Sequence, residues 1–217
     1  MIVVDSSSII SMAVNCLCPV IGKLGVEFTI TPKVYEEIIS KPSGSKRFAL
    51  ESMRINQLIK SGSLVVRKCE SDLGDRILSA ANKIYSIKGK NLKIIHAAES
   101  EAIGLAGEMN AKALLIDERT TRLLMEDPYE LRKLLSHRNK KEVNMDDQAL
   151  REIKELMPDI PVIRSAEVTA VAYEKGILTR MHGVADKDVL GAALSALKFS
   201  GCAITWDEVK EYEKAVI

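Results

Sequence analysis

Two short apolar runs, Ile2–Val4 and Ala113–Ile116, are continuous rather than alternating with polar residues. This pattern is typical of strands buried on both faces of a parallel sheet. Each run ends in an aspartate, Asp5 or Asp117, and polar residues that suit a helix start follow each one. One such aspartate is commonly a helix cap. Because ligands of open α/β sheets bind beyond the carboxyl ends of the strands, we interpret two of them as a candidate site.

The rest of the pattern predicts alternating strands and helices. Strands are expected at residues 27–30, 63–67 and 161–163, and helices near 7–15, 32–39, up to about 59, 72–87, 97–109 and 120–126. This order predicts an α/β fold with a central parallel sheet flanked by helices. The strongly charged residues at about 127–160 are interpreted as a helical insertion. The part at about 166–217 is predicted to be helical, near 166–175, 185–198 and 205–215, within one domain of residues 1–217.

Composition places the chain among ordinary globular proteins. Of its 217 residues, 47% are hydrophobic and 28% are charged, which favours neither disorder nor a membrane protein. The start of the chain does not resemble a signal peptide, and no apolar run is long enough to span a bilayer, so we expect a cytoplasmic protein. The four cysteines lack the spacings of a zinc ribbon and are expected to be reduced.

Two further regions offer inward carboxylates. In the helix near 97–109, the apolar stripe places Glu99 on the inward side and Glu101 nearer the solvated side. Glu99 also suits the first helical turn, where a carboxylate complements the helix dipole. Glu36 and Glu37 both flank the apolar stripe of the helix near 32–39, and periodicity does not choose between them.

Several short motifs then occur in a fixed order. They are IVVD at the start, TPKVYEE, ESEAIGLA, LLIDER, and a serine after the late strand in PVIRS. Their order resembles the PIN-domain family of nucleases, from Met1 to about Trp206 apart from the charged insertion. The resemblance implies a metal-dependent ribonuclease whose catalytic residues are Asp5, Glu37, Glu99 and Asp117. It also implies secondary site residues, for which we choose Ser6, Ser165 and Glu101.

Clustered carboxylates repel one another, and a cation is needed to keep them ionised together. Oxygen ligands with few histidines favour Mg²⁺ or Mn²⁺ over zinc. We expect Asp5, Glu99 and Asp117 to be metal ligands. Glu37 is expected to be a ligand or to orient and deprotonate the attacking water.

RNA binding requires positive charge beside these acids. The net charge is only +1, but residues 41–68 hold seven basic residues against one acid, and a second basic sector covers 128–142. A solvated face explains such runs equally well. As RNA-binding residues we choose Arg119, Arg122, Lys46 and Arg47. Other expected partners are a second copy of the chain, through the apolar C-terminal helices, and a small antitoxin-like protein.

Two other functions compete with the ribonuclease. A haloacid-dehalogenase-like phosphatase also begins with a buried strand that ends in aspartate, but its second aspartate would stand where this chain has Ser7. A catalytically silent module that binds RNA or a partner would use the acids only as helix caps. Such a module would bind RNA equally well in chelator, whereas a nuclease would need Mg²⁺ or Mn²⁺ to cut.

Overall fold

A five-stranded parallel sheet forms the centre of the molecule. The computed structural model describes residues 1–41, 48–178 and 188–215. The strand order is β3-β2-β1-β6-β8, and all neighbouring pairs are parallel. The strands are β1 Ile2–Val4, β2 Phe28–Ile30, β3 Leu64–Val66, β6 Ala113–Leu115 and β8 Val162–Ile163. The predicted fold class, a central parallel sheet flanked by helices, is therefore confirmed.

Helices cover both faces of this sheet, which explains why its central strands are continuously apolar. Val4 and Leu115 belong to one hydrophobic cluster, whereas Val3 and Leu114 belong to another on the opposite face. Alternate residues of one strand point to opposite faces, so both faces need apolar residues.

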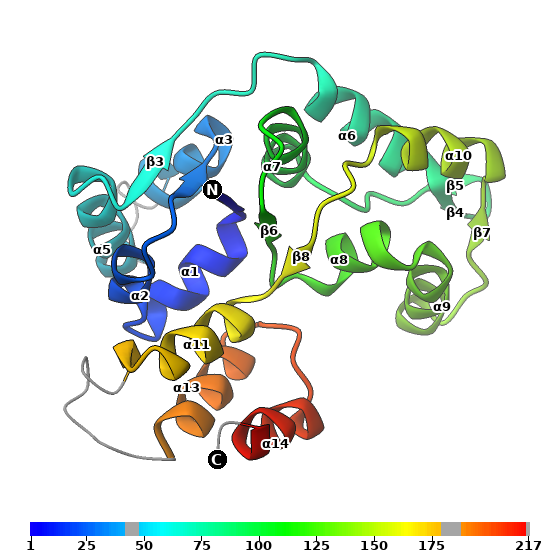
Figure 1. Cartoon of the computed structure of the whole chain (residues 1–217). Coiled ribbons are helices and arrows are strands. Elements are labelled where there is room, and N and C mark those ends of the chain that lie inside the picture. The colour runs from blue at the N-terminus through cyan, green and yellow to red at the C-terminus, as the bar shows by residue number, and fades with distance from the viewer. Residues whose placement is uncertain (42–47, 179–187, 216–217) are drawn as a thin grey trace.

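The helices divide between these clusters. On the first face lie α1 Ser6–Val14, α2 Cys18–Lys23, α3 Pro32–Tyr35 and α5 Ala49–Lys60. On the second lie α6 Leu73–Ile84, α7 Ala97–Glu108, α8 Arg119–Glu126, α9 Pro128–Asn139 and α10 Asp147–Leu156. Figure 1 shows α1, α2 and α5 grouped with β3, and α9 and α10 at the other end of the molecule.

The helix predicted at 32–39 changes type along its length. It is α-helical in α3 and becomes the π-helix η1, Glu36–Ser40, directly afterwards. A π-helical turn inserts an extra residue and rotates the side chains around it, and such turns are frequent at functional sites.

Helix α2 of the first face was not predicted from the sequence.

The charged region at 127–160, predicted as a helical insertion, contains helices α9 and α10 and one short strand between them. Between α9 and α10 the chain forms β7, Asn144–Met145, which pairs antiparallel with β4, Tyr85–Ile87. The chain is already extended at β4, so the helix predicted to reach residue 87 ends at Ile84. β4 also pairs with β5, Lys90–Asn91, through a turn in which Lys88 and Gly89 both have positive φ.

The C-terminal part consists of helices α11 Ser165–Glu174, α13 Asp188–Phe199 and α14 Trp206–Ala215. Figure 1 shows them packed together next to α1. Residues 185–187 of the predicted second helix lie outside the described residues. None of the helices in the described ranges has the length and apolarity needed to cross a membrane.

Candidate active site

The two strand-end aspartates leave the sheet at the same edge. Strands β1 and β6 are neighbours, with Val4 paired to Leu115, and the Asp5 amide donates to the Leu115 carbonyl over 3.0 Å. Asp5 therefore follows its strand directly, and Asp117 follows two residues after Leu115 on the adjacent strand. The parallel register brings together two residues that are 112 positions apart in the chain.

Asp5 is buried and only partly hydrogen-bonded. It is 2% exposed, and its Oδ2 accepts hydrogen bonds from the Ser7 amide at 3.0 Å and the Ser7 hydroxyl at 2.6 Å. Its Oδ1 is buried and has no hydrogen-bond partner. Burial raises the pKa of Asp5, the Ser7 hydrogen bonds oppose that rise, and repulsion from Glu37 adds to it. One oxygen of the Asp5 carboxylate is thus buried without a hydrogen-bond partner.

Asp117 is equally buried, at 1% exposure, but both of its oxygens are occupied. Oδ1 accepts the Ser165 amide and Oδ2 accepts the Ser165 hydroxyl, each at 2.7 Å. Burial raises the pKa of Asp117, and the bonds from Ser165 and the Cys202 thiol lower it. The Ala203 amide also donates to the Asp117 carbonyl. The start of α11 and the α13–α14 connection therefore fix the position of Asp117.

Glu37 and Ser6 are in direct contact. The Ser6 hydroxyl donates to Oε2 of Glu37 over 2.7 Å, which connects the first turn of α1 to η1. Glu36 is exposed and pairs with Lys41 at 3.9 Å. Of the two glutamates that periodicity left open, Glu37 is the one directed towards the strand ends.

Glu99 lies at the start of α7, where its Oε2 accepts the His96 amide at 2.7 Å. Burial raises the pKa of Glu99 to about 7, the His96 hydrogen bond opposes the rise, and repulsion from Asp5, Glu118 and Glu37 adds to it. Glu99 therefore lies near Asp5, Glu37 and Glu118, whereas the charge that acts on Asp117 is that of Glu167. Glu118 caps α8 through the Thr121 amide at 2.7 Å.

Glu101 does not lie on a solvated face, so that expectation was wrong. Its side chain is 15% exposed and accepts the Lys33 amide at 2.9 Å. Lys33 lies in the first turn of α3, where backbone amides lack partners within the helix. Glu101 therefore fixes the helical segment that carries Glu37.

The carboxylates of the candidate site are near one another without forming a closed set of ligands. No three Asp, Glu, His or Cys side chains in the described ranges are arranged as a ready metal-binding group. The chemistry of the donors nevertheless suits a hard cation, because Asp5, Glu37 and Glu99 supply oxygens. The partnerless Oδ1 of Asp5 is the one buried carboxylate oxygen in the described residues that has no hydrogen bond.

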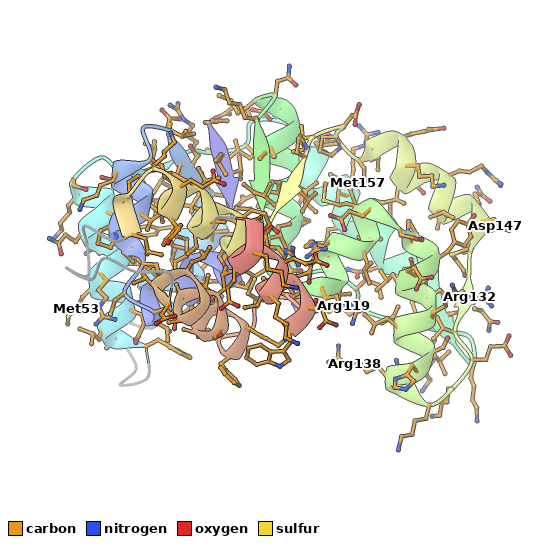
Figure 2. All side chains as sticks on the ribbon, turned by 60° about the horizontal axis from the view of Figure 1, so that its bottom comes forward. Met53, Arg119, Arg132, Arg138, Asp147 and Met157 are labelled. Carbon is orange, nitrogen blue, oxygen red and sulfur yellow. The ribbon has the colours of Figure 1, made fainter. Side chains whose placement is uncertain are left out.

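The predicted RNA-binding residues differ in availability. Arg119 is exposed at the start of α8, next to the acids, and Figure 2 labels it on the part of the molecule that carries α8 and α9. Arg122 is 19% exposed and pairs with Glu126 at 3.3 Å. Lys46 and Arg47 lie outside the described residues. In the sector 41–68, Arg67 pairs with Glu27 and Lys68 with Glu70, so acids outside that stretch neutralise part of its charge.

Sequence reasoning missed three residues that shape the site. Glu118 contributes to the acidic field, and its position directly after Asp117 was the available signal. Ser8 accepts the Asp117 amide at 2.9 Å and donates to the Leu115 carbonyl at 3.3 Å. Arg164, 9% exposed, joins Glu167 and Glu208 and donates to the Ala203 carbonyl at 2.8 Å, which ties α11 to α14. No local sequence pattern reveals the contacts of Ser8 with Leu115 and Asp117, or those of Arg164 with Ala203 and Glu208, because these partners are distant in the chain.

Comparison with known proteins identifies the first part of the chain. A family model described as a PIN domain matches residues 1–127, more than half of the sequence. The matched region contains β1 and β6 and all four acids chosen from the sequence. Searches of curated proteins and of solved structures found no match.

Proposed function

The chain belongs to the PIN-domain family, whose members are generally nucleases, and we propose that it is an Mg²⁺- or Mn²⁺-dependent endoribonuclease. The proposed site is the carboxyl edge of β1 and β6, with Asp5, Glu37, Glu99 and Asp117 as its functional acids. The proposal goes beyond family membership in naming the ion, the substrate and the residues.

The observation that carries this proposal is the open oxygen of Asp5. A buried carboxylate oxygen without a partner loses its hydration and gains no hydrogen bond in return. The neighbouring Glu37 and Glu99 make ionisation costlier still. A divalent cation bound at Oδ1 would offset both costs, since it adds positive charge and replaces the missing partner. An aspartate that served only as a helix cap would need Oδ2 alone.

The contacts of each residue suggest its role in the proposed reaction. Asp5 and Glu99 would hold the ion directly, and Asp117 would hold it directly or through water while Ser165 keeps its carboxylate in place. When bound, the ion would lower the pKa of a water and neutralise charge on the phosphate. Glu37, which Ser6 orients, would accept the proton of the attacking water as its oxygen bonds to phosphorus. The phosphorus–oxygen bond opposite then breaks, and its oxygen leaves with a proton from solvent.

Arg119 would contact the phosphate backbone of the substrate. It is exposed and lies two residues after Asp117, so a strand bound over the acids would pass close to it. Because the site itself is acidic, the positive charge of Arg119 would be the main local attraction for RNA when no metal ion is bound.

The experiment is cleavage of a fluorescently labelled single-stranded RNA by the full chain in Mg²⁺, in Mn²⁺ and in chelator. We expect cleavage with either ion and none in chelator, and we expect Asp5→Asn to be inactive. Glu152→Gln, which alters an exposed acid of α10 outside the site, is the matched control and should cleave like the unaltered protein. RNA binding that is identical in chelator, without cleavage under any condition, would instead identify a silent binding module.

A further inference from the structure

A cavity adjoins the acidic site. It measures about 360 Å³ and lies between α1, η1 and α5. Ser6 and Glu37 line it, and these two side chains also belong to the proposed active site. The cavity and the acidic site therefore share a wall, and a group held in the cavity would lie beside any phosphate bound over the acids.

The cavity has the walls of a pocket for a flat, largely apolar group. Ile10, Ile38 and Ile55 form its apolar surface, and Phe48, a residue that is 39% exposed, contributes an aromatic ring. Pockets of a few hundred Å³ that combine apolar walls with a few placed polar groups are typical of sites for small organic groups. Aromatic rings beside such walls are the usual surfaces on which nucleobases stack.

The backbone at Phe48 is unusual. Its φ is 63°, in the left-handed region that bulky residues rarely adopt. Backbone strain of this kind collects at binding and catalytic sites, where the surrounding structure maintains it. Here it places an aromatic residue at the first position before α5, where it lines the cavity.

The polar groups of the cavity indicate which base fits. Glu51 supplies a carboxylate and Lys41 an ammonium group. An ionised carboxylate only accepts hydrogen bonds, and an ammonium group only donates them. Guanine presents two adjacent N–H donors on one edge and a carbonyl oxygen next to them, whereas adenine has no ring N–H on that edge.

We propose that this cavity binds a guanine base of the RNA next to the bond that is cut. The inference rests on the proposed ribonuclease function. The base would stack on Phe48 and the isoleucines, Glu51 would accept its N–H groups, and Lys41 would donate to its carbonyl oxygen. The protein would then cut preferentially beside guanosine.

The first test measures binding without metal or catalysis. Nucleosides are added in chelator to protein labelled at the isoleucine methyl groups, and the NMR signals of Ile10, Ile38 and Ile55 are followed. We expect guanosine to shift them at concentrations about 5-fold or more below adenosine, the lower bound for a bidentate base contact. Glu51→Gln should abolish this difference. Equal shifts for both nucleosides, or none, would overturn the proposal.

Two further variants separate the ring from the fold. Phe48→Asn should weaken binding of both nucleosides without loss of folding, because asparagine tolerates the left-handed backbone. Met53→Ala is the control: Met53, labelled in Figure 2, lies on α5, is 69% exposed and does not line the cavity. It should bind both nucleosides like the unaltered protein.

The second test maps the cleavage sites on RNAs that contain all four bases. We expect cuts beside guanosine, and we expect the ratio of guanosine to adenosine sites to fall in Glu51→Gln. RNA cleavage with no base preference, together with unmoved methyl signals, overturns the guanine pocket while the ribonuclease proposal stands. Guanosine-specific methyl shifts in a protein that cuts no RNA contradict the ribonuclease proposal instead.

Discussion

Asp5 and Asp117 occupy equivalent places in the fold and differ in what surrounds them. Each follows a buried strand of the parallel sheet, each precedes a helix, and both are at most 2% exposed. Ser7, two residues along the chain, contacts one oxygen of Asp5 and leaves the other open. Ser165, 48 residues away, contacts both oxygens of Asp117.

The comparison teaches that a strand-Asp-helix pattern determines where a carboxylate lies but not whether it is free to bind a ligand. That depends on a partner from elsewhere in the fold. A residue two positions along the chain can reach one carboxylate oxygen, as Ser7 does for Asp5. In Asp117 both oxygens are occupied because a residue of another element, Ser165 at the start of α11, lies beside them. The open carboxylate is the expected cation ligand, and the occupied one is held rigidly beside it.

The largest expected effect comes from neutralising the open carboxylate. Asp5→Asn should lower RNA cleavage more than about 100-fold. Altering a residue that only hydrogen-bonds to a metal ligand usually costs about 10- to 100-fold, and Asp5 is proposed to bind the ion itself. It should also raise the thermal midpoint of the metal-free protein, because burial and Glu37 disfavour the charge that asparagine removes. Asp117→Asn should also lose cleavage, with a smaller gain in stability, because Ser165 already stabilises that charge. An equal gain would show that the two environments do not differ energetically.

The next effect distinguishes two acids of the same helix. Glu99→Gln should lower cleavage by about 10-fold or more, since Glu99 is proposed to hold the ion together with Asp5. Glu101→Gln should retain most activity, because a glutamine oxygen can still accept the Lys33 amide. Rates under single-turnover conditions give the ratio. Similar losses in both variants would place Glu101 in the reaction itself.

A third prediction removes one serine hydroxyl from each aspartate. Ser165→Ala removes the hydroxyl that bonds to Oδ2 of the buried Asp117 and should lower the free energy of unfolding by about 1–3 kcal/mol. Ser7→Ala should cost less, because Ser7 is only half-buried and water can replace its hydroxyl. Denaturant unfolding curves compare the two midpoints. A costlier Ser7→Ala would mean that Asp5, not Asp117, is the anchored residue.

The smallest effect is a pH dependence of stability in chelator. Asp5, Asp117 and Glu99 have raised pKa values in the folded protein, so the folded state binds more protons and stability rises as the pH falls from about 7 towards 4.5. Burial raises the pKa of Glu208, but bonds from Arg164 and Thr205 lower it to about 2, so its contribution is lost as the pH falls from about 4.5 towards 2. The thermal midpoint of the protein should therefore be highest near the pH at which these two ranges meet, about 4.5.

Glu99→Gln provides the control for that profile. It should flatten the limb between about pH 7 and 4.5 and leave unchanged the limb below about pH 4.5, to which Glu208 and Glu108 contribute. A variant profile that matches the original on both limbs would exclude Glu99 as a group with a raised pKa.

The sequence predicted the parts of the molecule that follow from local patterns. Continuous apolar runs identified β1 and β6, and the aspartates after them lie at one edge, as expected from a parallel sheet. The small antiparallel sheet was missed because its strands are two or three residues long and one of them lies within a charged region. Its one local signal was the Lys88–Gly89 turn, in which both residues have positive φ.

The contacts that distinguish the two aspartates were beyond local patterns. Ser165 was expected near the site from the family resemblance, but its double contact with Asp117 depends on the position of β8 beside β6. The inward side of Glu99 followed from helical periodicity. The same periodicity placed Glu101 in solvent, because it does not include α3, which covers that side of α7.

The most direct measurement of the central claim is Mn²⁺ binding followed by electron paramagnetic resonance, with and without Asp5→Asn. If a cation binds at the open oxygen of Asp5, the unaltered protein should bind Mn²⁺, Mg²⁺ should compete with it, and Asp5→Asn should weaken binding about 10-fold or more. Equal Mn²⁺ affinity in Asp5→Asn and the unaltered protein, or no binding to either, would contradict a metal site built on Asp5.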